Sequence, residues 1–325
     1  MRKVCILFPR LDVTFKEGFV PETRGEIPPI RVHWQNMCNY LIQMHRSDSV
    51  AVIEKPLWQF TTEFVESLDA DIIYVPHKST DTFPVREKNI FYYMQSVFPW
   101  QFYIDTKGFA GGASFYPLDI DKDRTIPSDS FYAQMQNRAK LGESKFSQPP
   151  SQILYLPKEF FFFPCQIPHD ETIKYHSDIS VLDSLVATCK ATEKLNVPLI
   201  VKGHPVNPGS MKSLHQAASK FKHVIWLDNV SIHDILPQAI AVVVVNSGVG
   251  METLLHKTPV VTFGRAEYDC VANPATVNNI VDVLQNLKFD KKKVEAFFQT
   301  WYEITHDTRI INIQNNPLLL SETSV

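Results

Sequence analysis

Residues 241–255, AVVVVNSGVGMETLL, decide the fold that the sequence predicts. The stretch opens with five apolar residues, four of them valine, which is typical of a parallel strand covered on both faces. Asn246, Ser247 and Gly248 then supply a turn and a helix N-cap. In the residues that follow, apolar side chains can face the sheet while Glu252 points elsewhere. The stretch therefore predicts a strand that passes through a tight turn directly into a helix.

A turn of this kind is a candidate binding site. It places unpaired backbone N–H groups and the positive end of a helix dipole at the carboxyl edge of a sheet, where open α/β folds bind ligands. An anion is the ligand that such a turn favours. The same residues also fit an ordinary strand-to-helix turn, so the rest of the chain has to decide between the two interpretations.

Length and composition limit the class of protein. A chain of 325 residues suits two domains of about 150 residues each. The net charge of −3 argues against a nucleic-acid partner, since no basic excess exists to neutralise phosphates. No stretch approaches the roughly 18 apolar residues of a membrane span, and the first apolar run is too short for a signal peptide, so a cytoplasmic protein is expected. The five cysteines are scattered and odd in number, which predicts free thiols and neither a disulfide framework nor a zinc site.

The first half of the chain alternates between strand and helix patterns. The long polar loop 9–29 is expected to border a substrate cleft, and the glycine-containing segment 100–116 to be irregular. The polar, proline-containing stretch 142–150 predicts an interdomain linker, which gives an N-terminal domain at 1–150. Strands are predicted at 3–8, 49–53, 71–75 and 89–94, and helices at 30–45, 57–68 and 130–141.

The second half repeats this alternation in a C-terminal domain at 151–325, whose terminal helices are expected to pack back on the N-terminal domain. The fold class is therefore α/β, with two Rossmann-like domains. Strands are predicted at 160–163, 199–202, 223–227, 241–245 and 259–263, and helices at 179–195, 210–220, 231–239, 278–287 and 291–303.

Polar or glycine-containing turns follow three strands of the second half. They are residues 166–170, Gly203-His204-Pro205 and 246–248. Because parallel strands end at one edge of a sheet, these turns are expected to converge on a crevice that faces the other domain. Pro205 fixes the backbone beside His204, whose ring could bond a phosphate or a base. A single histidine at a strand end can equally be a structural residue that only makes a hydrogen bond within the protein.

Glycosyl transfer needs parts of this kind: donors for a leaving phosphate, a clamp for ribose hydroxyls and a carboxylate near the anomeric carbon. Ser247 and the N–H groups after it fit the phosphate. Glu252 could accept ribose hydroxyls, or it is a solvated helix residue. Asp170 and Glu171 are available as base or nucleophile. The alternative for Asp170 is an N-cap of the helix beyond it, and His169 could instead be a base.

Motifs for other chemistries are absent from the sequence. It contains no GxxxxGK[ST], no GxGxxG after a strand, no HExxH and no GxSxG. Asp119, Asp121 and Asp123 lie in a turn-like polar segment and make no persuasive metal clamp. Neither a metal nor another cofactor is therefore expected.

Four motifs follow one another in the second half: FPCQ with Asp170 and then His176-Ser177, KGHP at 202–205, NSGVGME at 246–252, and PV through Gly264 to Tyr268-Asp269. They resemble those of the bacterial capsule polysaccharide biosynthesis proteins, and in particular their single-module Kdo transferases. The resemblance implies a GT-B fold, in which two Rossmann-like domains face each other across a cleft and CMP-Kdo binds the C-terminal domain. Thr253 and Cys165 depart from the family pattern, and the first 150 residues carry no motif of it.

The resemblance also assigns roles and partners. Its partners are a sugar-nucleotide donor and a capsule or surface polysaccharide or glycolipid acceptor, which leaves room for peripheral contact with the inner face of a membrane. A sugar-nucleotide epimerase and a non-catalytic subunit that binds a sugar nucleotide or polysaccharide remain as alternatives. The candidate catalytic residues are Gln166, Asp170 and Glu171, and the candidate donor-binding residues are Lys202, His204, Pro205, Asn246, Ser247, Gly248, Gly250 and Glu252.

Overall fold

The computed structural model describes residues 1–10, 29–85, 89–205 and 208–310. Contacts divide them into two compact units. The first unit holds the described residues up to Phe109 and those from Glu303 onward, and the second unit holds Ala110–Tyr302. The loop predicted at 9–29 lies almost entirely outside the described residues.

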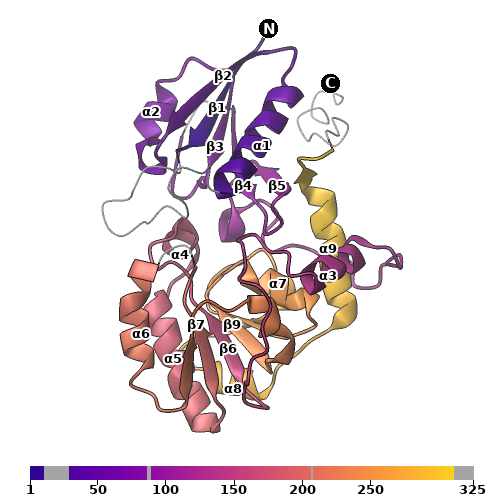
Figure 1. Cartoon of the computed structure of the whole chain (residues 1–325). Helices are drawn as coiled ribbons and strands as arrows, with labels where there is room; N and C mark the ends of the chain where they lie inside the picture. The colour runs from indigo at the N-terminus through magenta and orange to yellow at the C-terminus, as the bar shows by residue number, and fades with distance from the viewer. Residues whose placement is uncertain (11–28, 86–88, 206–207, 311–325) are drawn as a thin grey trace. The chain divides into compact units, whose positions relative to one another are not determined.

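The first unit is built on a six-stranded sheet with the order β12-β5-β4-β3-β1-β2 (Figure 1). Strands β1 to β4 are parallel, whereas β5 and β12 run antiparallel to their neighbours. The chain order reverses between β1 and β3, which makes their carboxyl ends the switch point of this sheet. The elements are β1 (Lys3–Pro9), α1 (Pro29–Met44), β2 (Ser49–Lys55), the 3₁₀ turn η1 (Leu57–Gln59), α2 (Thr62–Glu66), β3 (Ile72–Pro76), β4 (Asn89–Gln95), β5 (Gln101–Asp105) and β12 (His306–Asp307).

The second unit has a six-stranded sheet, all of it parallel, with the order β11-β10-β9-β6-β7-β8. Its switch point lies between β6 and β9. The elements are η2 (Ala110–Gly112), α3 (Phe131–Lys140), β6 (Phe161–Pro164), α4 (Glu171–His176), α5 (Val181–Leu195), β7 (Leu199–Lys202), η3 (Pro208–Met211), α6 (Lys212–Ala218), β8 (Val224–Leu227), η4 (Ile232–Asp234), η5 (Leu236–Gln238), β9 (Ala241–Val244), α7 (Val249–Leu255), β10 (Val260–Thr262), η6 (Asp269–Val271), β11 (Asn273–Pro274), α8 (Ile280–Gln285) and α9 (Lys291–Ile304).

Burial explains why the central strands of the second sheet read as uninterrupted apolar runs. All four residues of β6, β7 and β9 are buried, as expected for parallel strands with helices on both faces. Alternate residues of these strands pack against α5, α6 and α8 in one core. Helix α7 contacts β9 and β10 and also α3. The predicted α/β class with two Rossmann-like units is confirmed.

Several elements differ from the sequence prediction. The helix predicted at 57–68 is a 3₁₀ turn followed by α2, because the Thr61 side chain caps a new helix by accepting from the Phe64 N–H at 3.2 Å. The helix predicted at 231–239 is two 3₁₀ turns, with Pro237 at the start of the second. Strand β5 lies in the segment predicted to be irregular, and the six-residue helix α4 was not predicted.

The boundary predicted at residue 150 falls inside the second unit. Helix α3 is fixed to α7, since the Tyr132 hydroxyl donates to the Leu254 carbonyl at 3.2 Å and the Gln136 amide to the Leu255 carbonyl at 2.9 Å. Residues 110–150 therefore belong with the second sheet. At the other end of the chain, strand β12 pairs with β5 of the first unit, whereas α8 and most of α9 lie in the second unit.

Candidate functional site

The turns that follow β6, β7 and β9 lie along one edge of the second sheet. β6 pairs in parallel with β7 on one side and with β9 on the other, so all three strands end in the same direction. The structure thus brings together the turns 166–170, 203–205 and 246–248 at one edge of the sheet, as the sequence predicted. This edge includes the switch point between β6 and β9, which is where open α/β sheets bind ligands.

A reciprocal pair of amide groups holds this edge together. The backbone N–H of Asn246 donates to Oε1 of Gln166, and Nε2 of Gln166 donates to Oδ1 of Asn246, each at 3.0 Å. The Asn246 amide also donates to the carbonyls of Thr172 (2.9 Å) and His176 (3.3 Å). Both amide side chains are buried. The observed contacts of Gln166 therefore position the turn, and those of Asn246 tie the turn to α4.

The acidic pair after β6 begins helix α4. Asp170 is its N-cap, because Oδ1 accepts from the backbone N–H of Thr172 at 2.8 Å and from its hydroxyl at 2.5 Å. The capping role that the sequence left open is thus present. Glu171 is the first helical residue, and its Oε2 is buried without a hydrogen-bond partner among the described residues. His169 is exposed.

The turn between β9 and α7 uses most of its own donors. The N–H of Val249 donates to the Ser247 hydroxyl (3.3 Å), that of Gly250 to the Ser247 carbonyl (2.9 Å) and that of Met251 to the Gly248 carbonyl (3.0 Å). Helix α7 itself has seven residues. For the anion site that the sequence predicts here, only the first N–H groups of the turn remain as backbone donors. Side chains have to supply the other contacts to the anion.

Glycine is required at two positions beside this turn by close packing. The Tyr268 hydroxyl donates to the Ser247 carbonyl at 2.5 Å and lies where a side chain at position 250 would be, since a Cβ on Gly250 would sit 2.2 Å from the Tyr268 oxygen. A Cβ on Gly264 would lie 2.9 Å from the His176 carbonyl oxygen. Gly250 thus lets the loop after β10 approach the turn between β9 and α7, and Gly264 lets it approach the end of α4.

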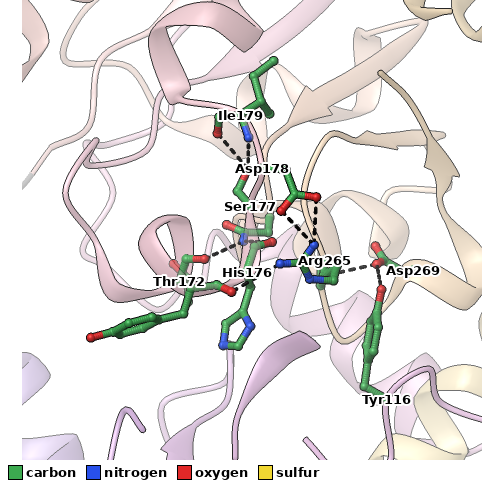
Figure 2. Close-up of polar contacts among 11 residues, drawn as sticks. Tyr116, Thr172, His176, Ser177, Asp178, Ile179, Arg265 and Asp269 are labelled. Atoms are coloured by element: carbon green, nitrogen blue, oxygen red, sulfur yellow. Dashed lines mark hydrogen bonds and ion pairs between the residues drawn. The ribbon is translucent and has the colours of Figure 1, made fainter. Parts of the chain in front are cut away.

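The loop after β10 is fixed to the end of α4 by the contacts that Figure 2 shows. The Arg265 guanidinium pairs with Asp178 at 3.2 Å and donates to the Tyr175 carbonyl, while its backbone N–H donates to the His176 carbonyl at 2.8 Å. The Tyr116 hydroxyl donates to Oδ2 of Asp269 at 2.6 Å. Burial raises the pKa of the Asp269 carboxyl. The side chains of this loop are therefore engaged in contacts that fix the backbone at the edge of the sheet.

His204 and Lys202 follow β7 and have different surroundings. Lys202 is buried, its ammonium donates to the Gly203 carbonyl at 3.5 Å, and it interacts electrostatically with Asp228. His204 is half-buried, and burial lowers its pKa to about 4, with Asp170 opposing this change and Lys202 reinforcing it. The imidazole is therefore neutral at pH 7 and can give or accept one uncharged hydrogen bond. Pro205, which follows it, is exposed.

Glu252 is buried, so it is not the solvated helix residue that the sequence offered as an alternative. It is 5% exposed, and its Oε1 accepts a hydrogen bond from the Ser144 hydroxyl. Burial raises the pKa of its carboxyl to about 7, although Ser144 and Lys145 both lower it. At neutral pH the group is poised between acid and carboxylate, and both forms can accept a hydroxyl donor.

Sequence reasoning missed the segment Ser144-Lys145-Phe146, which the composition of 142–150 assigned to a linker. Ser144 bonds Glu252, and the Phe146 ring meets the His204 ring edge-on with centroids 5.4 Å apart. Lys145 lies between them and interacts electrostatically with Asp170, Glu252 and Glu267. An aromatic residue inside a polar stretch, Phe146, was the signal available in the sequence.

A separate cavity of about 640 Å³ lies on the second unit beside the ends of α3 and α7. His233 and His256 line it and share a hydrogen bond of 3.0 Å between Nδ1 and Nε2. Burial lowers the pKa of His256 to about 4. None of the predicted site residues lines this cavity.

Other expectations concern thiols, metals and membranes. All five cysteines are free thiols, as predicted. Within the described ranges, no group of three or more histidine, cysteine or acidic side chains is arranged to hold a metal ion. In the same part of the chain, no helix combines the length and apolar character needed to cross a membrane.

Residues 138–300 match the family model described as "Capsule polysaccharide biosynthesis protein". Capsule polysaccharide modification protein LipB of Neisseria meningitidis is 27% identical over 122 residues, which is 34% of this chain and 29% of LipB. Capsule polysaccharide export protein KpsS of Escherichia coli is 23% identical over 124 residues, 35% of this chain and 32% of KpsS. The chain matches about a third or less of the length of these curated relatives.

Solved structures of similar topology are more distant in sequence. The beta Kdo 2,7 transferase of Thermosulfurimonas dismutans KpsC is 16% identical, with a TM-score of 0.49 over 91% of this chain and 90% of that chain. A UDP-GlcNAc 2-epimerase of Methanocaldococcus jannaschii is 10% identical, with a TM-score of 0.40 over 93% of this chain and 99% of that chain.

The packing of Tyr268 against Gly250 can be tested by a double-mutant cycle. Alanine at 250 would normally favour the helix, but its Cβ would overlap the Tyr268 ring and hydroxyl. We expect Gly250→Ala to lower the free energy of unfolding by about 1–3 kcal/mol in the parent and by clearly less in a Tyr268→Ala background. Urea denaturation followed by circular dichroism measures both values. Equal costs in the two backgrounds would contradict the packing.

The burial of Glu252 predicts a pH dependence of stability. Folding raises the pKa of its carboxyl from 4.5 to about 7, so below pH 4.5 the group is protonated in both states and has no effect. As pH rises towards 7, the unfolded chain loses this proton and the folded chain keeps it, so the free energy of unfolding falls, with the full cost present above that pH.

Glu252→Gln removes this titration. We expect the stability of the variant relative to the parent to rise by about 1–3 kcal/mol from acid to neutral pH and then to level off. Urea denaturation of both proteins at a series of pH values measures the difference, in which the other titrating groups cancel. A difference that does not change with pH would show that Glu252 ionises normally.

Proposed function

The chain belongs to the capsule polysaccharide biosynthesis protein family, and from that premise we propose that it is a glycosyltransferase. It moves a sugar from a nucleotide donor bound at the carboxyl edge of the second sheet to a capsule polysaccharide, or to another surface polysaccharide or glycolipid. The observation that carries this proposal is the set of buried polar groups that gathers on that edge beside the switch point between β6 and β9.

The proposed donor site has a contact for the ribose, the base and the phosphate of a sugar nucleotide. The buried Glu252 accepts the ribose hydroxyls, a role that its low exposure and elevated pKa support, because a dry carboxyl group gains most from a hydroxyl donor. The neutral His204 bonds the base or the phosphate. The first N–H groups of the Ser247–Gly248 turn face the phosphate, and Asn246 holds this turn in place through Gln166.

Asp170 is the proposed catalytic carboxylate. Its Oδ1 caps α4, and its negative charge acts on both His204 and Lys145, which places it beside the proposed donor site. The group acts there as nucleophile or base. Glu171, whose Oε2 is buried, is the reserve candidate. We propose transfer without a metal ion, since the sequence contains no persuasive metal clamp.

The donor that we propose is CMP-Kdo. The support is the resemblance of four motifs, in matching order, to the single-module Kdo transferases. The acceptor is proposed to bind the first unit, at the carboxyl edge of its own sheet. There His77 and Lys78 follow β3, and Gln95, the last residue of β4, shares a hydrogen bond of 2.6 Å with His33 of α1.

Single-turnover transfer in the presence of EDTA tests the function and the role of Asp170 together. We expect the parent to transfer Kdo from CMP-Kdo to a capsule glycolipid acceptor. Asp170→Asn should lose about 10²–10⁴-fold in turnover with little change in donor affinity, because asparagine keeps the cap and deletes the charge. The matched control is Asp290→Asn, since exposed Asp290 caps α9 by accepting from the N–H groups of Lys292 and Lys293.

The possible outcomes separate the candidate functions. Near-parental turnover by Asp170→Asn would reduce Asp170 to a helix cap. Loss of parental activity in EDTA would overturn metal-free transfer. Interconversion of a nucleotide sugar without acceptor would identify an epimerase, and binding without hydrolysis or transfer would identify a non-catalytic subunit.

A further inference from the structure

Lys145 lies outside the four sequence motifs, and the proposed function gives its ammonium group no role of its own. We propose that its ammonium group binds the phosphate of the nucleotide donor and stabilises the nucleotide as it leaves. This inference rests on the proposed binding of a nucleotide at the edge of the second sheet, and it gives that site a cation from outside the four motifs.

Contacts on both sides fix the position of Lys145. The preceding Ser144 donates its hydroxyl to Glu252 in α7, and the ring of the following Phe146 packs edge-on against His204 after β7. Further along, the Gln148 side chain accepts from the Ile232 N–H at 3.1 Å. The segment is therefore tied to the second unit at each of these points. Lys145 therefore lies between a residue that bonds the proposed ribose acceptor and a residue that packs against His204.

The charges around this position show why a cation is needed. Lys145 interacts electrostatically with the carboxyl groups of Asp170, Glu252 and Glu267. Without a positive charge, these acidic groups would repel a phosphate that enters the site. A single ammonium group among them can attract the phosphate. Its removal should therefore weaken phosphate binding much more than the loss of one surface charge would.

Two other basic side chains near this edge, Lys202 and Arg265, are committed elsewhere. Lys202 is buried, donates to the Gly203 carbonyl and interacts with Asp228. The Arg265 guanidinium pairs with Asp178 and donates to the Tyr175 carbonyl. Lys145 is partly buried, and its ammonium lies over the Phe146 ring at 5.9 Å from the centroid, where it makes no ion pair with any carboxylate of the described residues. Of the three, it is the one that can turn to an incoming anion.

The energetics favour an anionic ligand at this position. Burial lowers the pKa of the Lys145 ammonium, because the partly buried charge has lost part of its contact with water. A charge in such surroundings gains more from a direct bond to phosphate than an exposed lysine does, because less water has to be displaced. A nucleoside monophosphate, or the monophosphate part of a CMP-sugar, is the ligand class that fits one ammonium group beside a ribose acceptor.

Binding of CMP and of cytidine to the 325-residue chain tests this inference by calorimetry. The ratio of the two affinities isolates the phosphate. We expect Lys145→Met, which keeps the length of the side chain and deletes its charge, to lower this ratio about 10- to 100-fold. Lys145→Arg should keep the ratio within a few-fold of the parent. The matched control is Lys140→Met at the exposed end of α3, which should leave the ratio unchanged.

Cytidine affinity should be nearly the same in all four proteins and shows that the variants are folded. A parental CMP-to-cytidine ratio in Lys145→Met would overturn the inference, and so would an equal loss in Lys140→Met. If the ratio falls as expected while the parent transfers no sugar, the phosphate site stands and the proposed transferase activity fails. If the parent binds neither CMP nor a uridine or guanosine diphosphate, both proposals fail. Should Lys145→Met unfold, Lys145→Gln replaces it with the same expected result.

Discussion

The amide pair between Gln166 and Asn246 is the interaction on which the edge of the second sheet depends. Its two hydrogen bonds join the segment after β6 to the segment after β9. These two strands flank the switch point, where the chain order of the parallel sheet reverses. The Asn246 amide extends the link to α4 through the carbonyls of Thr172 and His176. A buried polar group without a partner costs free energy, so each amide holds the other in one orientation.

The rest of the edge is built on this frame. Asn246 fixes the turn in which Ser247 and Gly248 lie, Tyr268 bonds the Ser247 carbonyl, and Gly250 leaves room for the Tyr268 ring. Arg265 then joins the loop after β10 to the end of α4. Many residues that form the recognisable motifs therefore position backbone. The side chains left with chemistry to perform are few, and in our account they are His204, Glu252, Asp170 and Lys145.

How well the sequence predicted these features depended on the range of the interactions involved. Strand β9 and helix α7 were predicted because a run of valines before an Asn-Ser-Gly turn carries its structure locally. Helix α4, with six residues, is too short to show helical periodicity, and β5 enters the sheet antiparallel after an aromatic stretch. The convergence of the strand ends followed from topology alone.

The state of individual side chains could not be read in the same way. Glu252 looks like an exposed helix residue until Ser144, 108 positions away, covers it. The stretch 142–150 has the composition of a linker, yet it packs along the second unit through contacts that no local pattern encodes. Likewise, the neutral state of His204 comes from burial by residues distant in sequence. Burial by residues distant in sequence is therefore why the stretch 142–150 was predicted as a linker. It is also why the states of Glu252 and His204 stayed open at the level of sequence.

The central claim is that the carboxyl edge of the second sheet binds the nucleotide. Calorimetric titration of CMP, UDP and GDP into the parent and into His204→Ala, Ser247→Ala and His215→Ala tests it most directly. His215→Ala is the control, since His215 is an exposed histidine of α6 in the same unit. The account predicts that His204→Ala weakens the bound nucleotide about 5- to 100-fold and that His215→Ala stays within about twofold of the parent. Affinities within about twofold of the parent for both His204→Ala and Ser247→Ala would contradict it.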